Sequence, residues 1–431
     1  MTMLICSAGQ LTKSNGPRSD PLKNQLPKLA CTKPSERLEL FARKLHACCT
    51  CYNFADESSD LKAKELKLVY LQEIIEYIDL TQGVLTHEPI YALSTVMISR
   101  NIFRTFAPKD PDYDPDEDDA IFDPAWPHLE LVYQYFLHFL EANDFQPSIA
   151  KKYMDTRFVT RLLYVFGSDD MRERDILKTI LHRVYGKFLG LRATVRRQIN
   201  NIFLAYLYDG QEFTGVAEIL EILGSIINGY VSPMKPEHHL FLDKILIPLH
   251  SSKDMAFFQP QLVYCVVQYM EKDPKTAASI LKGLFKFWPK TCSTKEVLFL
   301  GELEELIDAM QPGEFTKNQD LILKQLSKCI TSHHFQVAER SLYFFDNEYI
   351  MSLVEVNADE CFPLVLHCLK SISLEHWNMS ISTLAATVLQ TFKDSNPDVF
   401  YKVLGLPRPP PKPRSIAQSM WMKAAGLSRK A

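Results

Sequence analysis

Residues 34–52 read PSERLELFARKLHACCTCY, and the apolar residues in this stretch follow a helical period. They are three or four residues apart, at Leu38, Phe41, Leu45, Cys48 and Tyr52. Positions with this spacing lie on one face of an α-helix. Pro34 suits the first helical turn because that position needs no backbone N–H donor. The stretch therefore predicts an amphipathic helix whose apolar face packs against another element.

The same period recurs along most of the chain, in runs of roughly 12 to 20 residues with short breaks between them. Pro89, Pro147 and Pro260 stand where such runs begin, and Ser293 with Glu296 has the spacing of a capping box. No segment combines period-two alternation with hairpin turns. We predict an all-α fold, a curved solenoid of HEAT-like antiparallel helix pairs with about eight repeats. A compact helical bundle is the alternative, because the repeats share a period but no sequence motif.

Three segments follow from composition. Residues 1–30 are polar and predict a disordered leader, and residues 31–404 contain the solenoid. Residues 405–431 form a basic, Pro-rich tail, which also predicts disorder. Within the solenoid, residues 108–124 (PKDPDYDPDEDDAIFDP) form an acidic loop that runs into a helix start at Trp126. The loop is either a solvated connection or a charged arm that contacts a basic partner.

Composition excludes several classes of protein. The formal net charge of −4 argues against a general nucleic-acid binder, and no run of apolar residues is long enough for a membrane span. The ten Cys predict reduced thiols in the cytoplasm or nucleus. Cys48, Cys49 and Cys51 lack a second zinc-binding pair, so packing is favoured over a metal site. Motifs for catalysis, cofactors and metals are missing, which predicts a non-catalytic protein.

The stretch Lys178–Arg197 (KTILHRVYGKFLGLRATVRR) carries the strongest functional signal. If it is one helix, a single quarter-turn contains His182, Tyr185, Leu189, Arg192 and Arg196. No carboxylate lies four residues from either arginine. Ile222 and Ile226 follow four apart, and then Lys235 and His238 three apart. This pattern predicts a groove for an acidic, partly apolar peptide, and a solvated helix face with a core edge is the alternative.

Long strings of the sequence resemble the B-prime family of protein phosphatase 2A regulatory subunits. They include AWPHLELVYQYFLHFLE (125–141), RERDILKTILHRVYGKFLGLRATVRRQINNIF (172–203), EILEILGSIINGY (218–230), FWPKTCSTKEVLFLGELEELID (287–308) and HFQVAERSLYFFDNEYIM (334–351). The resemblance covers roughly residues 30–400. It implies a non-catalytic solenoid that docks on a scaffold subunit and a catalytic subunit. It also implies selection of substrates through a Leu-x-x-Ile-x-Glu motif.

The resemblance assigns nine residues to the motif groove: His182, Arg183, Tyr185, Arg192, Arg196, Ile222, Ile226, Lys235 and His238. It implies that Tyr185, Ile222 and Ile226 receive the Ile of the motif. Arg196, Lys235 and His238 would receive its Glu and any neighbouring phosphate. The acidic loop resembles the segment that approaches the catalytic subunit, which makes Asp116, Glu117, Asp118 and Asp119 candidate contacts. Its Asp-rich composition departs from the Glu-rich pattern of the family, so only the location carries over.

Two other functions compete with this hypothesis. A solenoid adaptor or transport receptor would bind other linear peptides, but a receptor for basic cargo needs an acidic groove with Asn and Trp ladders. A hydrolase with an unrecognised site would be active without a partner, and no nucleophile–base pair is visible. We therefore expect a phosphatase regulatory subunit that is found in the cytoplasm and nucleus and has no cofactor.

Overall fold

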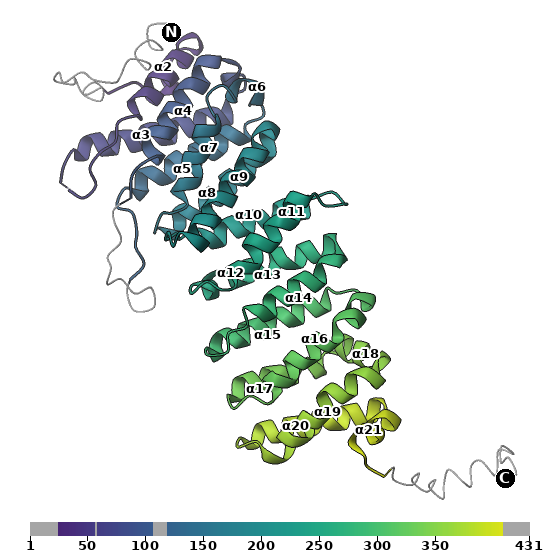
Figure 1. The fold of residues 1–431 in the computed structure, drawn as a ribbon. Coiled ribbons are helices and arrows are strands. Elements are labelled where there is room, and N and C mark those ends of the chain that lie inside the picture. Colours follow the sequence, from purple (N-terminus) through teal and green to yellow (C-terminus); the bar gives the residue numbers. More distant parts are fainter. Residues whose placement is uncertain (1–24, 57, 107–118, 408–431) are drawn as a thin grey trace, which may run out of the picture. The chain divides into compact units, whose positions relative to one another are not determined.

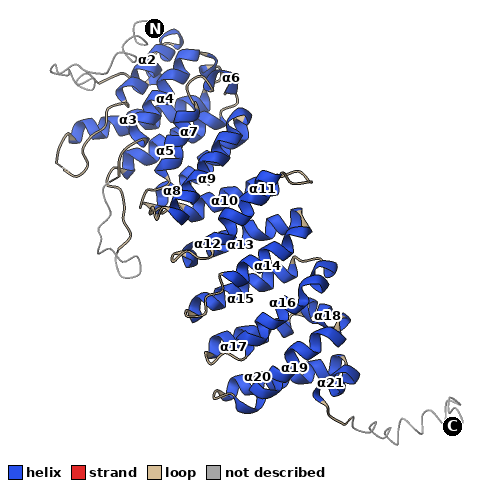
Figure 2. Cartoon of the chain, viewed as in Figure 1, coloured by secondary structure: helices blue, strands red, loops and turns tan. Residues whose placement is uncertain are grey.

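A computed structural model describes residues 25–56, 58–106 and 119–407, and these ranges contain no β-strand. Figure 1 and Figure 2 show helices joined by short turns. The chain divides into two compact units, Met1–Lys272 and Asp273–Ala431. The predicted all-α class is confirmed.

The first unit consists of two rows of stacked helices. Its helices are α2 (Pro34–Ala47), α3 (Leu61–Leu80), α4 (Glu88–Ile102), α5 (Trp126–Glu141), α6 (Pro147–Ala150), α7 (Thr156–Val165), α8 (Met171–Lys187), α9 (Arg192–Tyr208), α10 (Val216–Asn228), α11 (Pro236–Phe241), α12 (Ile247–Leu249) and α13 (Met255–Lys272). One row contains α3, α5, α8, α10 and α13, each in contact with the next. In the other row α2 packs on α4, and α7 packs on α9. This stacking is that of the predicted helix-pair solenoid.

The second unit repeats the arrangement. It contains α14 (Ala277–Lys286), α15 (Ser293–Asp308), α16 (Pro312–Ile330), α17 (Phe335–Leu342), α18 (Glu348–Val356), α19 (Ala358–Glu375), α20 (Met379–Ser395) and α21 (Pro397–Leu404). Helices α14, α16 and α19 form one row, and α15, α17 and α20 form the other. Neighbouring helices thus bury each other's apolar faces, since no single pair closes a core.

An aromatic cluster fixes the part of the first unit that positions the candidate site. Tyr91 of α4 packs on Phe139 of α5 with ring centroids 5.3 Å apart, and Phe139 packs on Phe145 at the same distance. Phe145 in turn meets the edge of Phe188 at 6.1 Å. All four side chains are buried. The cluster therefore holds Phe188, which lies just after the end of α8, in the core.

One predicted capping box and one predicted helix start are wrong. Ser293 is the first residue of α15 and not its cap; the N-cap is Cys292, and Glu296 accepts a hydrogen bond from Trp288 Nε1 at 2.7 Å instead. Pro260 lies inside α13, which begins five residues earlier, at Met255. Met255, the first residue of α13, is buried, so the helix begins within the core and not at the proline.

Most of the predicted leader (1–30) and of the predicted tail (405–431) lies outside the described residues, which exclude residues 1–24 and 408–431. Leu29, near the end of the predicted leader, is already buried, and its backbone N–H donates to Glu73 of α3. Cys48 and Cys49 are buried as expected, whereas Cys51 is exposed. No helix among the described residues is long and apolar enough to cross a membrane.

Candidate functional site

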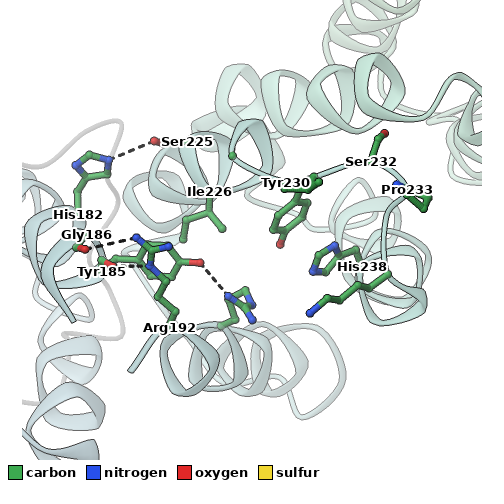
Figure 3. Close-up of a pocket in the computed structure, with 14 residues that line it drawn as sticks. His182, Tyr185, Gly186, Arg192, Ser225, Ile226, Tyr230, Ser232, Pro233 and His238 are labelled. Atoms are coloured by element: carbon green, nitrogen blue, oxygen red, sulfur yellow. Dashed lines mark hydrogen bonds between the residues drawn. The ribbon is translucent and has the colours of Figure 1, made fainter. Parts of the chain in front are cut away.

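A cavity of about 610 Å³ lies in the first unit and collects most of the predicted groove residues. Seven of the nine line it: His182, Tyr185, Arg192, Arg196, Ile226, Lys235 and His238. Figure 3 labels five of these seven around the space, His182, Tyr185, Arg192, Ile226 and His238. They come from α8, from α9, from α10 and from the segment that leads into α11. The residues thus converge from four consecutive helices, α8 to α11, within residues 182–238. Their binding role stays a prediction.

The single helix predicted over residues 178–197 is wrong. Helix α8 ends at Lys187, Phe188 has φ −108° and ψ 78°, and a short 3-10 turn (Leu189–Leu191) precedes α9. Phe188, the residue directly after α8, is buried in the aromatic cluster, where it packs on Phe145. Leu189, which the helical wheel placed on the binding face, is 68 % exposed and does not line the cavity. His182 and Tyr185 therefore face the arginines across a corner and not along one helix.

The two arginines keep their charge available to a ligand. Arg192 Nε donates to the backbone oxygen of Tyr185 at 3.0 Å, and its guanidinium lies 5.1 Å from the Tyr185 ring centroid. Arg196 Nη1 donates to Tyr185 Oη at 2.9 Å. These partners are neutral, and neither arginine forms an ion pair within the described residues. Both lie in the first two turns of α9, whose helix dipole adds positive potential at the same end. The corner is thus a prepared site for an anion.

The opposite side of the cavity combines a second cationic group with an aromatic wall. His238 stacks on Tyr230 with ring centroids 3.8 Å apart and planes 7° apart. Burial lowers the pKa of His238, and its buried Nδ1 has no hydrogen-bond partner among the described residues. Lys235 Nζ is 4.0 Å from a Glu237 carboxylate oxygen, a distance that leaves most of its charge exposed. The Glu237 carboxylate also lies 3.6 Å from His238 Nε2, so it flanks both groups. The mostly exposed Lys235 ammonium is the cation on this side of the cavity that an anion can reach.

Two of the nine predicted residues lie elsewhere. Ile222 is 2 % exposed and belongs to the core, one turn before Ile226 on α10. Arg183 does not line the cavity, and its Nε donates to Glu141 Oε1 at 2.6 Å across from α5. Both side chains of that ion pair are about half exposed, so an acidic ligand could compete for Arg183 only by replacing Glu141.

Several lining residues were not predicted from the sequence. They are Gly186, Ser225, Gly229, Tyr230, Val231, Ser232 and Pro233. Most belong to the loop of residues 229–235, which joins Ile226 on α10 to Lys235. Because both ends of this short loop were predicted at the groove, its length alone indicated that the loop has to pass the same site. Ser225 Oγ also lies 3.3 Å from His182 Nε2, which fixes the orientation of that ring.

The acidic loop is anchored where it meets α5. Arg104 donates two hydrogen bonds to Glu173, at 2.7 and 2.8 Å, and two to Asp123, at 2.7 and 3.1 Å. Glu173 is fully buried. Although burial opposes the charge, these carboxylates raise the pKa of Arg104. Arg104 and Asp123 therefore join the two ends of the loop at one point.

The candidate contacts within the acidic loop can be placed only in part. Asp119 is exposed, while Asp116, Glu117 and Asp118 lie outside the described residues. A contact of these four residues with a phosphatase subunit stays a prediction. Among the described residues no group of three or more His, Cys, Asp or Glu side chains is placed to hold a metal ion.

Fold and cavity together define a class of protein, an α-helical repeat protein with a cavity lined by basic side chains. Comparison with known proteins gives the family. Residues 26–406 match the model of "Protein phosphatase 2A regulatory B subunit (B56 family)". The chain belongs to this B56 family.

The curated relatives agree. The chain is 54 % identical over 376 residues to the 56 kDa regulatory subunit alpha isoform of serine/threonine-protein phosphatase 2A from Mus musculus, covering 87 % of this chain and 77 % of that protein. It is 53 % identical over 376 residues to the beta isoform from Homo sapiens, covering 87 % of this chain and 76 % of the relative. These relatives are named regulatory subunits, which supports a regulatory and not a catalytic role.

Proposed function

We propose that this protein assembles with the scaffold and catalytic subunits of protein phosphatase 2A and brings substrates to them by binding a Leu-x-x-Ile-x-Glu motif in the cavity described above. Its membership of a family of regulatory subunits supports the assembly. The observation that carries the motif proposal is the pair Arg192 and Arg196, whose donors meet only neutral groups of Tyr185 and Gly186.

The cavity offers two kinds of contact to such a motif. Ile226 and the Tyr185 ring supply an apolar wall that suits the Ile side chain, with the buried Ile222 packed behind. Arg196, Lys235 and His238 supply donors for the Glu carboxylate or for a nearby phosphate through charge-assisted hydrogen bonds. The Lys235 side chain is mostly exposed and only 4.0 Å from Glu237 at its nearest, so its charge stays available to such an anion.

Recruitment works by effective concentration. A motif held on the regulatory subunit keeps the phosphorylated site of the substrate near the catalytic subunit, so dephosphorylation becomes an intramolecular step. The regulatory chain itself needs no reactive group for this role. Selectivity then depends on which proteins carry the motif.

The test is a calorimetric titration with a Leu-x-x-Ile-x-Glu peptide. Arg192→Glu places a carboxylate in the cavity, and we expect peptide affinity to fall at least about tenfold, since truncating one partner of a charge pair already costs about 2 kcal/mol or more. Arg197→Glu is the matched control, because Arg197 is the exposed neighbour on α9 and does not line the cavity. Equal affinities of Arg192→Glu and the parent chain would show that the motif binds elsewhere.

Assembly is tested separately. Both variants should co-purify with the scaffold and catalytic subunits in the same amount as the parent chain, because the cavity is used for the substrate. Loss of assembly in Arg192→Glu alone would mean that this surface contacts the phosphatase core. A basic peptide of the nuclear-localisation type should fail to bind, and binding of that peptide would favour the transport-receptor function.

A further inference from the structure

One residue at the rim of the cavity has a feature that motif binding does not use. Ser232 is followed by Pro233, and no other Ser or Thr in the 431 residues precedes a proline. Lys235 lies three positions after Ser232. Proline-directed protein kinases accept a Ser-Pro pair that has a basic residue three positions after the serine. The serine lies in the exposed loop of residues 229–235 and lines the cavity, as Figure 3 shows.

We propose that Ser232 is a phosphorylation site and that its phosphate closes the cavity to acidic ligands. This inference rests on the proposed function, because it deepens how the motif site is regulated. In the modifying step a kinase transfers the γ-phosphoryl group of ATP to Ser232 Oγ. The Oγ–P bond forms, the bond between the γ-phosphorus and the bridging oxygen of ATP breaks, ADP leaves, and the hydroxyl proton passes to a base of the kinase.

The charges of the cavity explain why the phosphate would compete with a ligand. Arg192, Arg196 and Lys235 contribute three formal positive charges to the lining. A phosphoserine carries about 1.5 to 2 negative charges at neutral pH, together with three acceptor oxygens. It therefore offsets half or more of the charge that attracts a carboxylate, and it does so from a tethered position. A tethered anion has a higher effective concentration than a free peptide.

The present hydrogen bond of Ser232 also favours movement of a phosphate towards the cavity. Ser232 Oγ donates to the backbone oxygen of Lys272 at 3.1 Å. Lys272 is the last residue of α13, so this oxygen lies at the negative end of the helix dipole. A phosphate monoester at this position loses the donor and is repelled by the carbonyl. The cationic side chains on the cavity side are the favourable alternative.

The binding test uses the full chain with phosphoserine incorporated at position 232. Calorimetry with the Leu-x-x-Ile-x-Glu peptide compares this chain with the unmodified chain and with Ser232→Ala. We expect the phosphorylated chain to bind the peptide at least about tenfold more weakly than the unmodified chain and than Ser232→Ala. Phosphoserine at Ser251 is the matched control, because Ser251 is exposed in the same unit and does not line the cavity. The effect should also shrink at high salt, because screening weakens exposed charges.

The modification test treats the unmodified chain with a proline-directed kinase and ATP and locates phosphate by mass spectrometry. Phosphate at Ser232, absent from Ser232→Ala, supports the site, and a chain left unmodified at Ser232 overturns it. Equal peptide affinity with and without phosphoserine at position 232 overturns the closing role while the proposed function stands. If the unmodified chain itself fails to bind the peptide, the proposed function fails, and this inference fails with it.

Discussion

Gly224 of α10 offers a sharp test of the packing behind the cavity. A Cβ atom at this position would lie 2.5 Å from Cδ1 and from Cε1 of the Tyr264 ring on α13. Carbon atoms in contact are normally about 3.5–4.0 Å apart, so Gly224→Ala forces the ring or one of the helices to move by about 1 Å. The glycine is therefore required by the close approach of the two helices.

The expected magnitude follows from two opposing effects. Overpacking of this kind costs about 1–3 kcal/mol. Replacing a helical Gly by Ala raises the free energy of unfolding by about 0.5–1 kcal/mol, because the unfolded chain has less conformational freedom to lose. We expect Gly224→Ala to lower the free energy of unfolding by about 1–2 kcal/mol. Since Ile226 is two residues further along α10, the same displacement should also weaken binding of the motif peptide.

Thermal and urea unfolding followed by circular dichroism measure the effect. The double variant Gly224→Ala/Tyr264→Ala removes the clashing ring and should recover most of the loss, as Tyr264 is 46 % exposed and contributes little burial of its own. Gly301→Ala in α15 is the control for a glycine-to-alanine change without a clash, because the nearest atom to its Cβ lies at an ordinary contact distance of 3.8 Å. The reasoning would be refuted by a Gly224→Ala chain as stable as its parent, or by a double variant no more stable than Gly224→Ala.

Two further predictions concern buried charge. Arg104→Ala leaves the buried Glu173 carboxylate without its cation and should lower the free energy of unfolding by about 3–5 kcal/mol in urea titrations. The double variant Arg104→Ala/Glu173→Gln removes the unpaired charge and should recover part of the lost stability. If it recovers none, the unpaired carboxylate is not the cause. Burial lowers the pKa of His128 to about 4, with Lys67 and Lys64 contributing. Because the unfolded chain takes up the proton near pH 6.5 and the folded chain only near pH 4, the stability that neutral His128 provides is present above pH 6.5 and declines as the pH falls towards 4. The free energy of unfolding of the parent chain relative to His128→Gln should thus fall by at most about 3 kcal/mol between pH 7 and pH 4, and a pH-independent difference would contradict the assignment.

The sequence determined the fold class because apolar spacing depends on neighbours along the chain. Of the positions predicted from residues 34–52, Phe41 and Leu45 are fully buried on α2, and Cys48 is buried directly after it. Leu38 is half-buried, and Tyr52 lies beyond the helix, which ends at Ala47. Arg192 and Arg196 likewise lie on one side of α9, since four residues are close to one helical turn. The sequence also placed Ile226, Lys235 and His238 at the same site, through spacing and family resemblance.

Tertiary structure alone decided the geometry of the site. At the break between α8 and α9, Phe188 packs on Phe145, a residue more than forty positions earlier, and no local pattern encodes that contact. For the same reason Arg183 pairs with Glu141 of another helix instead of facing the cavity. The helical period depends on residues only a few positions apart. The cavity, in contrast, forms where four helices meet, and their packing depends on the fit of side chains across the whole unit.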